Sequence, residues 1–279
     1  MHKSRRLIAQ LLGYFRLWLG APRTLWMFAS MLLLCVLQAR GACIYQFHGE
    51  TLYPLEMIAY HFYDGLHLMM SSTIFLLGCS EIPRRISWQQ QSLIRSSRRS
   101  WLFSHIGQCM LMVCVTMLMM IAVTLVASLD HLRLGNGWSD LERIARMEIM
   151  PWDSIIPSSF LIESTTPLQG AVMCILPVML FWFTMLLVIL LFGMTSRSHA
   201  GLLICAFAVL SYVCMMQEDG WLGYFALFRY THLSGMNLDA RGISYFRNVM
   251  IGYGILDFGL VAMMTAMVQR MDFALPAGA

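Results

Sequence analysis

Long stretches without a charged residue alternate with short charged segments along the whole chain. Five stretches hold no Asp, Glu, Lys or Arg, and a sixth is interrupted only by Asp257. A helix rises about 1.5 Å per residue, so roughly 20 apolar residues cross a hydrocarbon core about 30 Å thick. We therefore predict six transmembrane helices, over residues 24–39, 65–80, 100–129, 164–196, 198–217 and 248–269. The first two stretches are short, and we expect their helices to extend into Pro22-Arg23 and into the aromatic residues 60–63.

The composition agrees with a membrane protein. Hydrophobic residues make up 58% of the 279 residues and charged residues only 12%, whereas soluble domains carry about 25% charged residues. The expected fold is all-α: a polytopic integral membrane protein with one bundle-like membrane domain, which accounts for nearly the whole chain.

The first 22 residues predict a helix that lies along the membrane surface. Leu7, Leu11 and Trp18 fall on one helical face, whereas Arg5 and Arg16 fall on the other. We assign residues 1–22 to this interfacial helix, 23–271 to the membrane domain and 272–279 to a tail. The helix either anchors the first span or transmits motion to it.

The distribution of charge predicts the orientation. With a cytoplasmic N-terminus, the inner segments hold twelve cationic and two acidic residues, and the outer segments hold seven cationic and twelve acidic ones. Cationic residues accumulate on the cytoplasmic side of membrane proteins, so both termini should be cytoplasmic. The segment 81–99 is then internal, and 41–58, 130–166 and 218–247 are external. The net charge of +4 therefore reflects topology, and we expect no nucleic-acid partner.

The segment 81–99 is the most organised of the predicted inner segments. Its apolar residues and its Pro83 suit a short surface helix that leads into the third span. Such arginines either fix the topology and contact anionic lipid headgroups, or form a docking surface for a cytoplasmic partner. The charged residues concerned are Glu81, Arg84, Arg85, Arg95, Arg98 and Arg99.

The sequence lacks the motifs of common enzymes. Its single lysine, Lys3, has no glycine-rich turn before it, which excludes a P-loop nucleotide site. There is also no G-x-S-x-G, no H-E-x-x-H and no membrane-protease motif. We expect no catalytic residues and no bound cofactor. Any work done in the membrane must therefore be driven by a gradient, by a ligand or by a separate ATP-hydrolysing partner.

Two aspartates are candidates for functional or structural contacts inside the bundle. Asp257 lies in the middle of the sixth predicted span, where an ionisable group is costly unless it pairs, protonates or faces water. It either lines a pathway or forms a buried hydrogen bond between two helices. Asp64 is a second candidate for a pathway or a buried polar contact. Glycines 252, 254 and 259 predict close helix packing near Asp257.

No metal site is predicted. His61, Asp64 and His67 have i, i+3, i+6 spacing, which on a continuous helix spreads them too widely to close on one ion. The eight cysteines form no C-x-x-C pair, and we expect those within the spans, including Cys35, to pack as small apolar residues. The 25 methionines suggest a copper protein, but those of the third span surround the helix, which favours adaptable packing.

The pattern resembles the permease subunit of type-two ABC exporters, especially those of anaerobic Gram-positive bacteria. The stretch Leu93-Ile-Arg-Ser-Ser-Arg-Arg-Ser-Trp-Leu102 is similar to an R-[TS]-[GS]-R-x-x-W-[LI] signature before the third span. Tyr63-Asp64-Gly65 and Asn136-Gly-Trp-Ser139 also resemble such permeases. The six spans and the N-terminal amphipathic helix extend the resemblance over nearly the whole chain.

The resemblance implies a transport subunit without its own nucleotide site. Residues 81–99 would carry the coupling helix that inserts into an ATP-binding cassette subunit, and that subunit would bind ATP and Mg. A second permease chain, identical or homologous, would complete the exporter in the cell membrane. The substrate would be apolar or amphipathic: a peptide, a lipid-like molecule or a drug. The alternative is a non-transporting membrane protein, such as a sensor or a peptide-sequestering immunity factor.

Overall fold

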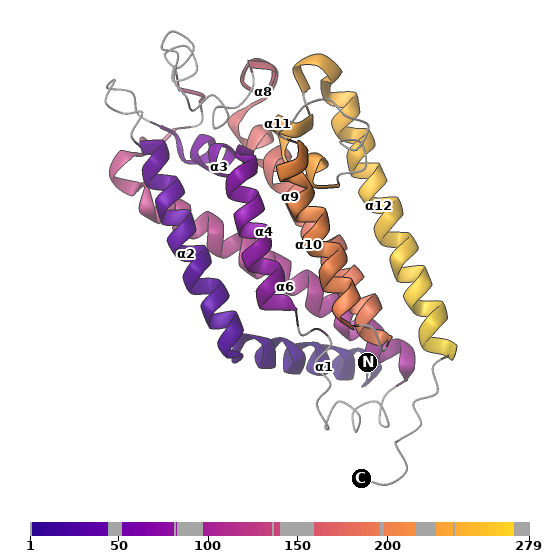
Figure 1. The fold of residues 1–279 in the computed structure, drawn as a ribbon. Coiled ribbons are helices and arrows are strands. Elements are labelled where there is room, and N and C mark those ends of the chain that lie inside the picture. The colour runs from indigo at the N-terminus through magenta and orange to yellow at the C-terminus, as the bar shows by residue number, and fades with distance from the viewer. Residues whose placement is uncertain are drawn as a thin grey trace.

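The chain forms a bundle of helices, shown in Figure 1 as a computed structural model. The structure describes residues 2–43, 52–80, 82, 97–135, 137–139, 159–195, 198–215, 227–236 and 238–270, and all the regular elements among them are helical. The α-helices are α1 (His2–Leu19), α2 (Pro22–Cys43), α3 (Pro54–Tyr63), α4 (Gly65–Cys79), α6 (Arg98–Ala127), α8 (Ser159–Ser164), α9 (Pro167–Met194), α10 (Ser198–Met215), α11 (Leu233–Met236) and α12 (Leu238–Arg270). Two 3₁₀ turns, η2 (Leu129–His131) and η4 (Leu227–Tyr230), complete the described elements.

A helix occurs at each of the six positions where the sequence predicts one. Within the described residues, α2, α6, α9 and α12 are long and apolar enough to cross a membrane. The apolar helices α4 and α10 are shorter, so the structure supports four candidate spans and not the full set of six. The all-helical fold class is confirmed.

Helix α9 occupies the centre of the bundle. It contacts α3, α4, α6, α10 and α12, and it is the most deeply buried of the four candidate spans. Its start is well defined, because Pro167 stands at the first helical position and Thr166 and Gln169 form a capping box. An almost entirely apolar helix surrounded by other helices is the expected solution for a segment that is hydrophobic on every face.

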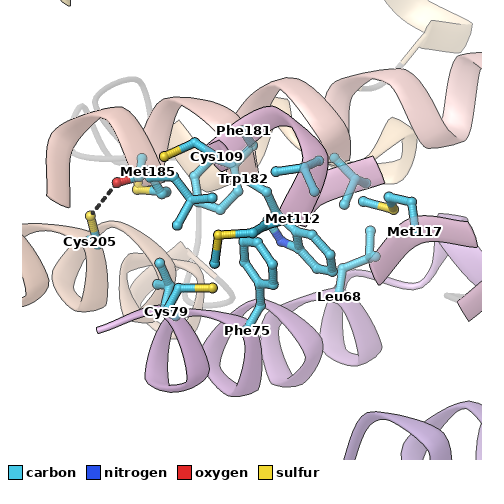
Figure 2. Packing of buried hydrophobic residues seen from close by; sticks show 14 of the residues in the cluster. Leu68, Phe75, Cys79, Cys109, Met112, Met117, Phe181, Trp182, Met185 and Cys205 are labelled. Atoms are coloured by element: carbon cyan, nitrogen blue, oxygen red, sulfur yellow. Dashed lines mark hydrogen bonds between the residues drawn. The ribbon is translucent and has the colours of Figure 1, made fainter. Parts of the chain in front are cut away.

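Aromatic and sulfur-containing side chains fill the space around α9. Trp182 stacks on Phe75 of α4 with ring centroids 4.3 Å apart and planes 13° apart, and its indole Nε1 donates to Ser72 Oγ at 2.8 Å. Cys205 of α10 donates to the carbonyl oxygen of Met185 at 3.5 Å. Figure 2 shows Phe75, Trp182, Met185 and Cys205 together with Met112 of α6, so four helices share one core. The methionines here pack as adaptable apolar groups.

The predicted outer segments meet at one end of the bundle. Arg40 at the end of α2 forms an ion pair with Asp130, with Nη1 and Oδ2 2.8 Å apart. Leu52 and Leu132 form an isolated parallel bridge, and the amide of Arg133 donates to the carbonyl of Leu52 at 2.9 Å. Helix α1 lies at the opposite end, across the base of the bundle (Figure 1). Among the described residues, the Arg40–Asp130 ion pair and helix α1 therefore lie at opposite ends of the bundle.

The glycines near Asp257 lie on the exposed face of α12. A Cβ built on Gly252, Gly254 or Gly259 meets no atom of the described residues within 4 Å. The predicted close packing at these glycines is therefore not found among the residues that the structure describes. Gly242 has a different role: its φ of +69° interrupts the helical geometry near the start of α12, and L-residues with a side chain rarely adopt that conformation.

Candidate functional site

We call residues 81–99 the arginine segment. Of its predicted site residues, Glu81, Arg84, Arg85 and Arg95 lie outside the described part of the chain. The remaining two predicted site residues, Arg98 and Arg99, form the exposed first turn of α6.

Ser97 starts helix α6 and is its N-cap. Its side chain accepts from the amide of Ser100 at 3.2 Å, an interaction that satisfies one of the free amides of a first turn. Arg98 Nη1 donates to the carbonyl oxygen of Gln269 at 3.0 Å. A cation is favourable there, because the last carbonyls of a helix carry partial negative charge. The end of the arginine segment is thus joined to the C-terminal end of α12.

Helix α1 is bound to the same end of α6. Tyr14 stacks on His105 with ring centroids 4.4 Å apart and planes 16° apart. Gln108 Nε2 donates to the carbonyl of Tyr14 at 3.4 Å, and Ser104 Oγ donates to Gln10 Oε1 at 3.3 Å. These interactions fix the orientation of α1 relative to α6.

The apolar face of α1 has two parts. Tyr14 and Trp18 are buried against the bundle. Ile8 and Leu12, which the sequence places on the same apolar face, remain more than half exposed. The predicted amphipathic helix is present, and the second part of its apolar face is free to enter a membrane interface.

Asp64 separates two helices that the sequence pattern reads as one span. Its φ of −72° and ψ of 112° are extended, and it is both the C-cap of α3 and the N-cap of α4. Its Oδ1 accepts from the amide of Leu66 at 2.9 Å, and its Oδ2 accepts from Gln38 Nε2 on α2 at 3.2 Å. Asp64 therefore makes buried polar contacts at the point where one helix ends and the next begins.

The break at Asp64 brings His61 and His67 together. Their Nε2 atoms are 3.1 Å apart, and Cys35 Sγ of α2 lies 3.7 Å from His61 Nε2. Thr124 of α6 contacts the other ring nitrogen, His61 Nδ1, at 3.1 Å. All three ligand-type side chains are buried. We name Cys35, His61 and His67 the Cys-His cluster.

The sequence argument against a metal site assumed a continuous helix, and that assumption is wrong. On a continuous helix, residues six positions apart point in different directions. The extended backbone at Asp64 re-aims α4, so that His67 faces His61 across the break. Asp64 itself, the middle residue of the predicted trio, stays outside the cluster. The missing signal was the Asp-Gly pair at 64–65, which is typical of a turn or a helix start.

Asp257 forms a hydrogen bond between α12 and α9. Its Oδ1 lies 2.7 Å from Thr184 Oγ1, and its residue is 9% exposed. Thr184 Oγ1 is also 2.9 Å from the carbonyl oxygen of Leu180. The single hydroxyl proton of Thr184 can serve only one of these two acceptors at a time. Asp257 thus contacts the central helix α9 through the side chain of Thr184.

The sequence did not predict a polar network that surrounds Glu56 in helix α3. The carboxylate of Glu56 accepts from the amide of Tyr53 at 3.1 Å and from the hydroxyl of Tyr60 at 3.2 Å. It also accepts from the amide of Ser139 at 3.1 Å and from the Ser139 hydroxyl. Burial raises the pKa of Glu56, and these hydrogen bonds oppose that rise. The available signal was Pro54 followed by Glu56, which marks a helix start.

No protein-family model, curated protein or solved structure matches this chain. The function must therefore be inferred from the chain's own residues: a helical bundle with four candidate spans, the helix α1 bound across one end and buried polar contacts between its helices.

Proposed function

We propose that this chain is the permease subunit of an ABC transporter, acting in export together with a separate ATP-binding cassette subunit and a second permease chain. The observation that carries the proposal is the anchoring of the arginine segment. On its N-terminal side, α4 ends at Cys79, and Ser80 accepts a hydrogen bond from Arg23 Nη1 at 3.3 Å. On its C-terminal side, Arg98 binds the end of α12. A push on this segment would therefore act on α2, α4, α6 and α12.

Helix α1 extends the same mechanical connection. Because it is bound to α6 through Tyr14 and Gln10, movement of the first turn of α6 moves the interfacial helix as well. Nucleotide binding on the partner subunits would draw two arginine segments together and tilt the helices that they end. The chain carries no P-loop lysine, so the energy for this movement would come from ATP and Mg on the partner.

The membrane-facing surface is consistent with a second permease chain or with lipid. Large apolar side chains on α2 and α12 are strongly exposed, among them Trp26 at 74% and Phe258 at 77%. Such a surface is stable only in contact with lipid or with another apolar protein face. Six short helices enclose little volume, so a substrate pathway would lie between two such chains.

Co-purification of an ATPase subunit tests the proposal. The tagged chain is extracted from its native membrane in mild detergent, and the bound ATPase subunit is quantified. Arg95→Ala combined with Arg99→Ala changes the arginine segment and leaves the Arg98 contact intact. Arg40→Ala combined with Arg133→Ala is the matched control, because it removes two arginines at the other end of the bundle.

We expect a stoichiometric ATPase subunit with the unchanged chain and with the control, and at least a tenfold loss with the first double variant. A chain that carries no ATPase subunit in its native membrane would refute the proposal. That outcome would favour a non-transporting membrane protein, such as a sensor or a peptide-sequestering immunity factor. Retention of the ATPase by the first double variant would refute the docking role of the arginines.

A further inference from the structure

The Cys-His cluster has the composition of a metal site inside an apolar bundle. Cys35 comes from α2, His61 from α3 and His67 from α4, and their ligand atoms all lie within 4.8 Å of one another. Residues from three separate helices converge on one point, and each is buried. Three such polar side chains are unusual in a membrane bundle, where ionisable groups are costly and generally have a specific role.

The spacing of the ligand atoms is close to that of a coordinated ion. Bond lengths of about 2.0 Å to nitrogen and about 2.3 Å to sulfur place two ligand nitrogens about 3.4–3.6 Å apart and a sulfur about 3.6–3.8 Å from a nitrogen. The observed distances are 3.1 Å between His61 Nε2 and His67 Nε2 and 3.7 Å between Cys35 Sγ and His61 Nε2. All three ligand atoms lie within 4.8 Å of one another, so side-chain shifts of up to about 1 Å would place them in one coordination shell.

Hydrogen bonds around the cluster leave the ligating nitrogen of His61 available. Thr124 Oγ1 is 3.1 Å from His61 Nδ1, which orients the ring and directs Nε2 toward Cys35 and His67. Metal-bound histidines generally have such a partner on their second nitrogen. Asp64 is not available as a ligand, since both its oxygens already accept hydrogen bonds from Leu66 and Gln38.

The two facing histidines share one proton when no ion is bound. Their Nε2 atoms are 3.1 Å apart, and only one proton can stand between them, so one ring donates and the other accepts. Ser71 Oγ also lies 3.4 Å from His67 Nε2. An ion bound at both Nε2 atoms would take the place of the shared proton. His67 Nδ1 is buried without a hydrogen-bond partner among the residues that the structure describes, and binding through Nε2 leaves it so.

The charge of the site selects the ion. A thiolate and two neutral imidazoles carry one negative charge, so a monovalent cation gives a neutral site and a divalent cation leaves a net positive charge in an apolar environment. A structural zinc site also needs a fourth protein ligand. Thiolate and imidazole ligands in a three-coordinate arrangement suit Cu⁺, a soft ion.

We propose that Cys35, His61 and His67 form a three-coordinate Cu⁺ site that joins α2 to the α3–α4 break. On binding, the Cys35 thiol releases its proton to solvent and forms the Cu–S bond, and each histidine donates one Nε2 lone pair. No electron is transferred. The proposal stands independently of the transport function.

The test is an anaerobic titration of the full-length chain in detergent micelles with Cu⁺, in the presence of bicinchoninate as a competing chelator. We expect one Cu⁺ per chain. Cys35→Ser and His67→Gln should each weaken binding by at least about 100-fold, since loss of a direct ligand costs no less than loss of a supporting residue. The matched controls are Cys109→Ser, at a buried cysteine of α6, and His199→Gln, at an exposed histidine; both should bind Cu⁺ as the unchanged chain does.

X-ray absorption on the unchanged copper-loaded chain keeps the test decisive if a variant fails to fold. We expect one sulfur and two nitrogen neighbours around copper. A shell made of methionine sulfurs alone would overturn the assignment, and so would equal binding by Cys35→Ser and Cys109→Ser. Retention of Zn²⁺ in place of Cu⁺ would overturn the choice of ion.

Discussion

The contact between Asp257 and Thr184 allows a quantitative test of how the peripheral helix α12 is attached to the central helix α9. Replacement of Asp257 by Asn keeps an acceptor oxygen at the position of Oδ1, 2.7 Å from Thr184 Oγ1. If the aspartate acts only as a hydrogen-bonding group, Asp257→Asn should change the free energy of unfolding by less than about 0.5 kcal/mol. Thr184→Val removes the hydroxyl and should cost about 0.6–1.7 kcal/mol, the range of hydrogen bonds between membrane helices.

The coupling energy between the two residues should lie in the lower part of that range. Thr184 Oγ1 also lies 2.9 Å from the carbonyl of Leu180, so its hydroxyl keeps an acceptor when Asp257 is changed. A double-mutant cycle with Asp257→Leu and Thr184→Val isolates the pair, because each single change removes the same hydrogen bond. We expect a coupling energy of about 0.6–1 kcal/mol.

Reversible unfolding in mixed detergent-lipid micelles, followed by tryptophan fluorescence at neutral pH, measures these energies. A coupling energy of zero would mean that the hydrogen bond does not form in the folded protein. A gain of several kcal/mol on Asp257→Asn would mean that the aspartate is buried in its charged form, which contradicts a simple hydrogen-bonding role. Loss of transport with unchanged stability would assign Asp257 to a pathway.

Three further predictions follow from exposure and packing. Ser97→Cys should be protected from a membrane-impermeant thiol reagent in intact cells. Leu134→Cys, at a residue that is 93% exposed, should be labelled more strongly than the parent chain. The reverse labelling pattern would invert the proposed orientation. Gly201→Ala should lower the free energy of unfolding by about 1–3 kcal/mol, because its Cβ would lie 2.8 Å from Phe192 Cβ and 3.3 Å from the backbone of α9. Gly254→Ala, where the described residues leave the Cβ open space, should be neutral or stabilising by up to about 1 kcal/mol. Equal effects of the two changes would contradict the α9–α10 packing. Burial raises the pKa of Glu56 above its ordinary 4.5, so its contribution to stability is present below that pH and is lost as the pH rises through the raised pKa. Glu56→Gln should flatten the fall in stability that this residue causes as the pH rises above 4.5, and parallel curves for the two proteins would refute the shift.

The positions of the helices follow from the sequence because apolar stretches without charge have few alternatives in a membrane. The predicted runs 100–129, 164–196 and 198–217 agree with α6, α9 and α10 within a few residues at each end. The helix α1 was also predictable, since its polar and apolar residues separate at helical spacing. In these segments one dominant physical effect, the burial of apolar surface, decides the structure.

The polar contacts inside the bundle could not be obtained in the same way. A single residue, Asp64, changes the direction of the chain, and helical spacing counted through it gives the wrong neighbours for His61 and His67. Cys35 joins them from a helix 26 residues earlier than His61, a distance over which no periodic pattern operates. The contact between Glu56 and Ser139 joins residues that lie even farther apart in the sequence. Such contacts depend on how the helices pack, which apolar patterns specify only loosely.

The place of α9 also constrains how the protein is made. Its neighbours α3, α4 and α6 are synthesised before it, whereas α10 and α12 emerge from the ribosome after it. A nascent chain that stops after α9 would leave one side of its most hydrophobic segment facing lipid, without the cover that the last two helices supply. Final closure of the bundle must therefore wait until translation has nearly finished, and quality-control proteases of the membrane would have their best opportunity in that interval.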